Sequence, residues 1–324
     1  MAKKTYIGVN NVARQVKKVY IGVNGVARKV KKIYIGVANI ARQVFGGGES
    51  SYYGTATPLS EARSNLAATS VGDYALFGGG YGSGGDSSTV DAYNTSLTRS
   101  TPTALLRSRG YLAATSVGDY ALFGGGYLNS DIPSPTVDAY NTSLTRTLAT
   151  ALSKGRCYLA ATSVGDYALF GGGGNRNYDH FSTVDAYNTS LTRSTPAALS
   201  KAQANLAATS VGDYALFGGG SNLGASSVYA YNTSLTCSTP TALSEGRGYL
   251  AATSVVNYAL FGGGNPASSI VDAYDTSLTR STPTALSKAR SNLAATSVGD
   301  YALFGGGSNN SNVDFSTVDA YIVD

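Results

Sequence analysis

Short apolar runs separated by tight polar turns recur along most of the 324-residue chain. In the stretch LAATSVGDYALFGGG, at 66–80, two such runs flank the pair Gly72-Asp73. Glycine and aspartate between runs rich in Val, Thr, Tyr and Phe predict two antiparallel strands joined by a tight turn. We therefore expect one strand at 66–71 and a second at 74–80.

The same fifteen residues return unchanged at 112–126, 159–173, 206–220 and 293–307. A sixth copy, at 250–264, differs only at Val256 and Asn257. Two further expected strands, TVDAY and LTRSTPTAL or their variants, follow the copies, and successive glycine triplets are 43 to 47 residues apart. Four short strands at this spacing are typical of a β-propeller blade. The predicted fold is therefore all-β, with a six-bladed propeller over 52–324.

The two ends of this array predict how the propeller closes. The last unit stops after its third expected strand, STVDAY, and so lacks a fourth. The segment GTATPLSEARSNL at 54–66 matches STPTALSKARSNL at 281–293 almost position for position. We expect 52–59 to supply the fourth strand of the last blade, a 3+1 closure that protects both sheet edges.

A different repeat, of fourteen residues, occupies the amino terminus: KKTYIGVNNVARQV at 3–16, followed by variants at 17–30 and 31–44. The YIGV runs and the pair Asn24-Gly25 predict hairpins, which together would form a small β-meander. Three short hairpins bury little apolar surface, so this module needs further copies of itself or another protein for stability. The stretch FGGGESS at 45–51 is predicted to be a glycine-rich linker rather than the end of a truncated blade.

The formal charge of +5 is distributed unevenly. Residues 1–44 contain ten of the 24 Lys and Arg residues and no acidic residue, which leaves 14 basic against 19 acidic residues in the remainder. Tyrosines lie between the lysine pairs, a weak match to a nucleic-acid-binding surface. Attachment to a protein partner or to other copies is the favoured interpretation of this basic module.

The repeated motifs resemble those of a known family. GDYALFGGG followed by VDAYNTS resembles the kelch repeat in all six units, although the tryptophan usual near the fourth strand is absent throughout. The combination of YIGVNGVARKVKK repeats with a kelch-like array is similar to structural proteins of phages and prophages of Firmicutes. That resemblance implies a tail-associated, host-recognition component, located in the virion or in the bacterial cytoplasm before assembly. No signal peptide follows Lys3 and Lys4, and no stretch reaches membrane-spanning length.

Variation among the units is confined to particular connections. The turn between the first two strands is SVGD in five units, and NTSLTR between the last two changes little. The loops between the second and third strands, and the segments before each first strand, differ in every unit. In an antiparallel blade these two kinds of variable connection lie on the same side. Diversity on one face of a fixed frame predicts a recognition surface.

The candidate ligand-binding residues come from these variable segments. Tyrosine offers flat amphipathic contact area, Asn and Ser adaptable hydrogen bonds, and Arg forked bonds to a carboxylate, phosphate or acidic sugar. Alternatively, the arginines tie adjacent blades together. In the segments before the first strands the candidates are Arg63, Asn65, Arg109, Tyr111, Arg156, Tyr158, Gln203, Asn205, Arg247, Tyr249, Arg290 and Asn292. In the loops they are Tyr81, Asp86, Tyr127, Asp131, Arg176, Tyr178, His180, Asn222, Asn265, Asn309 and Asp314.

Residues suited to catalysis are scarce. The single histidine, His180, lies in a variable loop, and Cys157 and Cys237 occupy different repeat positions. We therefore expect no metal site, no cofactor and no catalytic triad. Loop acids such as Asp179 leave glycoside cleavage open, but acids in polar loops are more often solvated. The chain is predicted to be a non-enzymatic, homo-oligomeric protein that recognises a host-surface glycan or protein; the alternative is a scaffold that docks one fixed protein partner.

Overall fold

The structure, a computed structural model, describes the strands within residues 1–46 and residues 56–129, 132–220 and 224–322. Contacts within the chain divide it into two units, Met1–Thr55 and Ala56–Asp324. The described residues form strands and turns but no helix, so none of membrane-spanning length and hydropathy is found among them.

Each fourteen-residue repeat of the first unit forms one hairpin: β1 (Tyr6–Val9) with β2 (Val12–Gln15), β3 (Tyr20–Val23) with β4 (Val26–Lys29), and β5 (Lys32–Val37) with β6 (Ile40–Gly46). Among the described residues of this unit each hairpin is a separate two-stranded sheet, and none of the pairings joins one hairpin to the next as in the predicted small meander. Residues 24 and 25 lie outside the described residues, but Val23 pairs with Val26, as a two-residue turn requires. Strand β6 includes Phe45 and Gly46, which were predicted as linker, while 47–51 are not described.

The second unit begins with a four-stranded antiparallel sheet of β8 (Ala67–Val71), β9 (Tyr74–Gly78), β12 (Val90–Tyr93) and β13 (Arg99–Ser100). Four more four-stranded sheets and one three-stranded sheet of the same kind follow in chain order. Short strands in the connections are β7 (Arg63–Ser64), β10 (Tyr81–Gly82), β11 (Gly85–Asp86), β16 (Tyr127–Leu128) and β17 (Ile132–Pro133).

The second sheet contains β14 (Ala113–Val117), β15 (Tyr120–Gly124), β18 (Val137–Asn141) and β19 (Arg146–Leu148), and the third β20 (Ala160–Val164), β21 (Tyr167–Gly171), β22 (Val184–Asn188) and β23 (Arg193–Ser194). The fourth contains β24 (Ala207–Val211), β25 (Tyr214–Gly218), β26 (Val228–Asn232) and β27 (Cys237–Ser238). The fifth contains β28 (Ala251–Val255), β29 (Tyr258–Gly262), β30 (Val271–Asp275) and β31 (Arg280–Ser281), and the sixth β32 (Ala294–Val298), β33 (Tyr301–Gly305) and β34 (Val318–Ile322).

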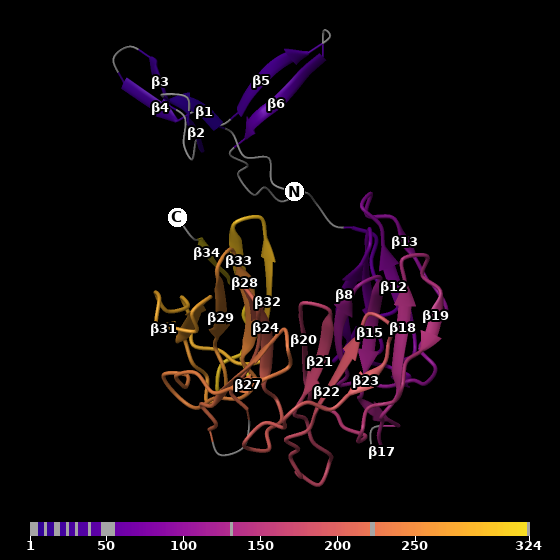
Figure 1. Cartoon of the computed structure of the whole chain (residues 1–324). Coiled ribbons are helices and arrows are strands. Elements are labelled where there is room, and N and C mark those ends of the chain that lie inside the picture. Colours follow the sequence, from indigo (N-terminus) through magenta and orange to yellow (C-terminus); the bar gives the residue numbers. More distant parts are fainter. Residues whose placement is uncertain are drawn as a thin grey trace. The chain divides into compact units, whose positions relative to one another are not determined.

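The sheets succeed one another through their first strands, which we call the inner strands. Strand β14 contacts β8 and β20, and the series continues through β24 and β28 to β32. Figure 1 shows the same succession as a colour gradient from indigo to yellow through the second unit. This all-β arrangement of repeated antiparallel sheets is consistent with the propeller-like fold predicted from the sequence.

The predicted closing strand is not seen among the described residues. Residues 52–55 lie outside them, and 56–59 belong to no strand. The segment contacts the first sheet instead, where the Tyr93 hydroxyl donates to the Thr57 carbonyl at 2.7 Å. Strand β34 pairs only with β33, so the sixth sheet has three described strands.

The fourth strands are shorter than predicted, with two residues in four of the sheets and three in the second. Pro102 follows β13 closely and has no N–H to donate to a ladder. The chain then bends toward the second sheet, where the Leu106 N–H donates to the Asp138 carboxylate at 2.9 Å. A proline after the second ladder pair therefore ends the strand.

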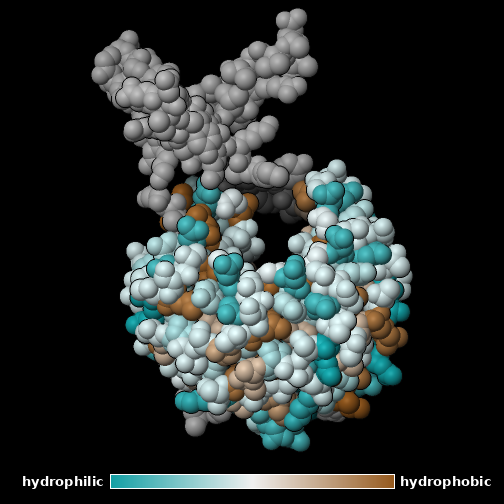
Figure 2. All heavy atoms as spheres, viewed as in Figure 1, coloured by the Kyte–Doolittle hydropathy of each residue, from teal (hydrophilic) through white to brown (hydrophobic). Residues whose placement is uncertain are grey.

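The core lies between successive sheets, where a phenylalanine ring of one sheet packs on a strand-end glycine of the preceding sheet. A Cβ atom at Gly78 would lie only 2.8 Å from the Phe123 ring. The same contact recurs between Gly124 and Phe170 and in the three following interfaces. Surface hydrophobic residues of the second unit occur in small groups among polar ones on the side visible in Figure 2. The repeated stretch thus contains both halves of the contact that joins the sheets.

Stability should depend on the neutral form of the tyrosines in the third strands. Burial raises the pKa of Tyr140, Tyr187, Tyr231 and Tyr274 above the ordinary value of 10. The folded protein therefore holds these protons more tightly, and stability is fully present below pH 10 and falls above it. We expect a loss of about 1.4 kcal/mol per pH unit for each tyrosine that ionises only on unfolding. Urea unfolding at about pH 8 and about pH 11, with tyrosinate absorbance recorded, tests this; equal midpoints would contradict it.

Candidate functional site

The two kinds of variable segment lie side by side in the structure. The segment before each inner strand bridges the loop after the second strand of the same sheet, as in Gly110 with Tyr127 and Cys157 with Gly174. Equivalent pairs occur in the first, fifth and sixth sheets, whereas residues 221–223 of the fourth loop lie outside the described residues. We call the surface made by these loops and segments the variable face. It is a single face, as the alternating strand directions predicted.

The residues that enter the inner strands are linked to one another by backbone hydrogen bonds. The Tyr111 N–H donates to the Asn65 carbonyl at 3.0 Å, and the Tyr158 N–H donates to the Tyr111 carbonyl at 3.2 Å. Asn205, Tyr249 and Asn292 continue the same series. A hollow of about 200 Å³ lies among the first five of these six residues, from Asn65 to Tyr249, and the leucine that follows each of them. The predicted Asn and Tyr positions therefore gather around one point of the variable face.

All six linked residues have a left-handed backbone, with φ between 52° and 55°. Asparagine tolerates this conformation, whereas for a bulky residue such as tyrosine it costs about 1–2 kcal/mol. Tyrosine nevertheless occupies three of the six positions: Tyr111, Tyr158 and Tyr249. A residue kept against its backbone preference indicates a role for its side chain.

A second hollow, of about 260 Å³, adjoins the first and shares Tyr111 and Tyr158 with it. Its other lining residues are Tyr81, Tyr127 and Arg176. The rings of Tyr111 and Tyr158 lie 4.8 Å apart between centroids, and the Tyr127 ring lies 6.2 Å and 5.7 Å from them. Burial raises the pKa of Tyr158 to about 12, so its hydroxyl stays protonated at neutral pH. Five predicted residues from three sheets thus form one tyrosine hollow, the name used below.

The remaining loop candidates are dispersed over the variable face. Tyr178 is 87% exposed, and Asp86 pairs with Tyr81 at the edge of the tyrosine hollow. His180 bridges Gly174, and Asp314 bridges Ser308. Asn265 is exposed, Asn309 is half-buried and holds its own loop through hydrogen bonds to two backbone N–H groups, and Asp131 and Asn222 lie outside the described residues.

The five predicted arginines in the segments before the inner strands do not face a ligand, because their side chains are buried. Arg109 is fully buried and donates to Asp138 at 2.7 Å and to the Phe123 carbonyl at 3.0 Å. A second arginine, Arg146, reaches the other oxygen of Asp138 at 3.0 Å. The same fully buried side chain paired with an aspartate recurs in Arg63, Arg156, Arg247 and Arg290. The structure therefore corrects their assignment as ligand contacts and supports the alternative, a structural role.

These groups of two arginines and one aspartate, which we call arginine–aspartate clusters, join strands within a sheet. In the fifth sheet, burial alone would raise the pKa of Asp272, but hydrogen bonds from Arg280 and Arg247 outweigh it and hold the pKa below its ordinary value. The first arginine of a cluster also contacts the preceding sheet through its backbone. In the second sheet, the carbonyl of Arg109 accepts a hydrogen bond from the Gly80 N–H at 2.9 Å. Each cluster thus fixes the segment from which the variable face is built.

The fourth sheet replaces the whole cluster with neutral residues. Gln203, Tyr229 and Cys237 occupy the positions of the first arginine, the aspartate and the second arginine. The Tyr229 hydroxyl accepts a hydrogen bond from the Lys201 N–H at 3.1 Å, whereas the aspartate oxygen in other sheets accepts from the N–H one position earlier in the segment. Joint replacement was visible in the sequence, and it is the signal that could have identified the arginines as part of the frame.

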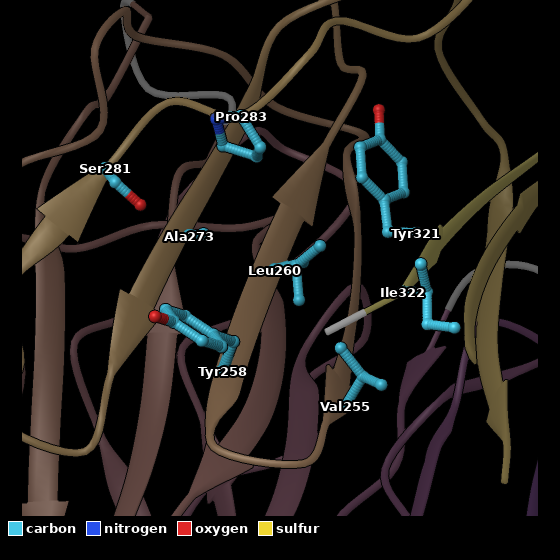
Figure 3. A pocket seen from close by; sticks show the side chains of 8 residues that line it. All are labelled: Val255, Tyr258, Leu260, Ala273, Ser281, Pro283, Tyr321 and Ile322. Carbon is cyan, nitrogen blue, oxygen red and sulfur yellow. The ribbon is translucent and has the colours of Figure 1, made fainter. Parts of the chain in front are cut away.

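A third hollow, of about 290 Å³, lies between the fifth and sixth sheets and is mainly apolar (Figure 3). Leu260 and Val255 face Tyr321 and Ile322 of β34 across it. At the interface between the first and second sheets, the equivalent hydrophobic residues pack against Leu144, the leucine between the third and fourth strands. This hollow belongs to the end of the array rather than to the variable face.

Comparisons with known proteins identify the fold alone. No family model and no curated protein matches the chain. Among solved structures, the chain is similar to the "Structure of YjhT", with a TM-score of 0.63 and 13% sequence identity. The match covers 83% of this chain and 96% of that chain. Within the ranges that the structure describes, no group of three or more His, Cys, Asp or Glu side chains could hold a metal ion.

The joint replacement in the fourth sheet yields a test of the clusters. Asp138→Tyr alone leaves two largely buried guanidinium groups without their carboxylate and should cost about 3–5 kcal/mol of unfolding free energy. The triple variant Arg109→Gln, Asp138→Tyr, Arg146→Cys reproduces the neutral set and should recover most of that loss. Urea unfolding of the single and triple variants measures the difference; an equal loss in both would show that the two sets are not interchangeable.

Proposed function

We propose that this chain is a non-enzymatic recognition protein whose variable face binds a saccharide on a host cell surface. The observation that carries the proposal is the gathering of Tyr111, Tyr158 and Tyr249 on that face in a backbone conformation that disfavours tyrosine. A bulky residue retained at such a cost is best explained by what its ring and hydroxyl contact.

The chemistry of the face suits sugars better than a small apolar ligand. Tyrosine rings pack on the apolar faces of pyranoses, and their hydroxyls, with nearby Asn and Ser side chains, exchange hydrogen bonds with sugar hydroxyls. The two hollows on the face that contain tyrosines are shallow, which suits a chain of sugar units held by many weak contacts. Several copies of the protein would add avidity without one deep pocket.

The proposed setting is the tail of a phage or prophage of Firmicutes. It is supported by the resemblance of the YIGVNGVARKVKK repeats and the kelch-like array to structural proteins of that group. In this proposal residues 1–44 attach the protein to other virion proteins or to further copies of itself. An alternative remains a scaffold that docks one protein partner; it predicts a stoichiometric complex and no affinity for saccharides.

We further propose that the second unit closes into a six-bladed propeller. The two ends of the array carry complementary halves of the contact that joins every other pair of sheets. Gly305 of the sixth sheet has no phenylalanine packed on it, and Phe77 of the first sheet is only half-buried, whereas Phe123 is fully buried. Val318 is 60% exposed, whereas its equivalent Val271 is 0% exposed. Closure would pack Phe77 on Gly305 and bury the exposed sides of the first and sixth sheets.

A designed disulfide tests closure. At a seen interface, a Cβ at Gly72 would lie 3.5 Å from the Thr142 Cβ, within disulfide range, and the equivalent pair at the proposed seam is Gly299 and Thr95. In a chain with Cys157→Ser and Cys237→Ser, the pair Gly299→Cys and Thr95→Cys should form an intramolecular bond on mild oxidation. Non-reducing electrophoresis and mass measurement detect it, with Gly72→Cys and Thr142→Cys as the matched control.

A cross-linked dimer instead of a cross-linked monomer would mean that a second copy covers these faces, and closure would be wrong. If the seam pair fails to form a disulfide while the control pair forms one, closure would also be wrong. Cysteine at position 299 is sterically plausible because Val256 occupies the equivalent position with a φ of 51°.

Recognition is tested by replacing the three tyrosines with asparagine, the residue at the equivalent position in the other three units. The variant Tyr111→Asn, Tyr158→Asn, Tyr249→Asn suits the left-handed backbone, so unfolding free energy should change by no more than about 1 kcal/mol. Binding of the full chain to host cells, and to saccharides extracted from them, should fall at least about tenfold.

The matched control changes the opposite face in the same manner. Asp119→Asn, Asp166→Asn and Asp213→Asn copy the residue that Asn257 places in the fifth unit. This control should bind as the unchanged protein does. Undiminished cell binding by the tyrosine variant would overturn the proposed role of the variable face, and binding to one host protein without saccharide affinity would favour the scaffold.

A further inference from the structure

The tyrosine hollow differs from the rest of the variable face because of Tyr127. Tyr127 is 3% exposed, and among the described residues its hydroxyl has only the neighbouring Cys157 thiol as a weak partner. Burial, followed by the neighbouring Cys157 thiol, raises the pKa of Tyr127 far above 10, so the hydroxyl stays neutral. A thiol is a weak hydrogen-bond partner, so a buried hydroxyl beside it is poorly satisfied unless a ligand or solvent group completes its bonding. A polar group is therefore available at the floor of the hollow.

The position of Tyr127 is not required by the frame. The residues that follow the glycine triplets at the equivalent position are Tyr81, Gly174, Ser221, Asn265 and Ser308. Most of the other sheets thus form the same backbone bridge with a small or polar residue. A tyrosine follows the glycine triplet in the first and second units alone, and the ring of Tyr127 completes the three-ring group with Tyr111 and Tyr158.

Among the described residues that line the hollow, Arg176 is the charged one, and it comes from the loop of the third sheet. That loop is held in a turn because the N–H groups of Asn177 and Asp179 both donate to the Asn175 side-chain oxygen at 3.0 Å. The Asp179 carboxylate is engaged within the loop by the Asn175 amide at 2.9 Å. The guanidinium thus stands at the wall of an aromatic hollow on a locally ordered loop.

This combination selects for the charge of a ligand. Tyrosine cages without a cation attract quaternary ammonium groups, but a guanidinium in the wall opposes them. A guanidinium forms forked hydrogen bonds with a carboxylate or phosphate. Outside residues 1–44 the chain has 14 basic and 19 acidic residues, so any preference for an anion comes from local contact rather than from the net field.

We infer that the tyrosine hollow is a subsite for an acidic sugar unit. The sugar ring packs among Tyr111, Tyr158 and Tyr81, its anionic group meets Arg176, and a ring or substituent oxygen accepts from the Tyr127 hydroxyl. The inference rests on the proposed saccharide-binding function and adds the class of saccharide. The shared chemistry is an anionic group on a sugar or polyol unit, supplied by a uronic acid or by a phosphate.

The test compares an acidic saccharide with its neutral ester, and adds a phosphate-bearing polyol to distinguish carboxylate from phosphate. Calorimetric titration of the full chain uses a short galacturonic acid oligomer, its neutral methyl ester, and a glycerol-phosphate oligomer. We expect the acidic oligomer or the phosphate oligomer to bind at least about tenfold more tightly than the ester. A preference for the uronate identifies the carboxylate as the group recognised, and a preference for glycerol phosphate identifies the phosphate.

Variants then assign the effect to the hollow. Arg176→Gln should lower affinity for the anionic probe about tenfold and leave affinity for the ester unchanged, while Tyr127→Phe should lower both a few-fold. The matched control is Arg107→Gln, because Arg107 is an exposed arginine of the variable face that does not line the hollow. It should bind every probe as the unchanged chain does.

The outcomes separate this inference from the function on which it rests. Equal affinity of the unchanged chain for acid and ester, or an equal loss for both in Arg176→Gln, would overturn the acidic-sugar subsite. Saccharide binding that is indifferent to charge but lost in the three-tyrosine variant would leave the proposed function in place. Binding of no saccharide, from any source including host cells, would overturn both.

Discussion

The architecture depends on one contact, a phenylalanine ring lying against a glycine of the preceding sheet. A Cβ at Gly124 would lie 2.7 Å from the Phe170 ring, so no residue with a side chain fits there without a shift of the neighbouring sheet. The glycine and the phenylalanine are adjacent in the repeated stretch, and each copy uses its phenylalanine toward one neighbour and its glycine toward the other. A change in either residue would disturb an interface, which explains why the stretch is identical in almost every unit.

The fixed frame supports the variable face through buried charge. Each arginine–aspartate cluster holds the segment that enters an inner strand, and the neutral set in the fourth sheet shows that charge itself is not essential. Buried ion pairs are expensive to desolvate and contribute mainly through the loss incurred when one partner is removed. The clusters are best understood as fixing the direction of the chain, while the loop residues above them remain free to differ.

The sequence predicted what depends on local pattern. The strands Ala67–Val71 and Tyr74–Gly78 and the shared side of the variable connections follow from alternation and tight turns. It did not predict the burial of Arg109, because an arginine beside a loop is more often exposed and its partner, Asp138, lies 29 residues away. Nor did it predict the left-handed backbone at Tyr111, because asparagine is common in that conformation whereas tyrosine is rare in it.

The distribution of tyrosines argues for one binding region rather than six equivalent sites. A sixfold site would carry the same residue in every unit, as the frame does. Instead, Tyr111 and Tyr158 stand in adjacent units, Tyr81 and Tyr127 come from the loops beside them, and Arg176 completes the set from the third sheet. Because the frame is uniform, this concentration does not follow from folding requirements. Under the proposed function, a ligand that contacts mainly the first three sheets would account for it, with Tyr249 of the fifth sheet as a further contact.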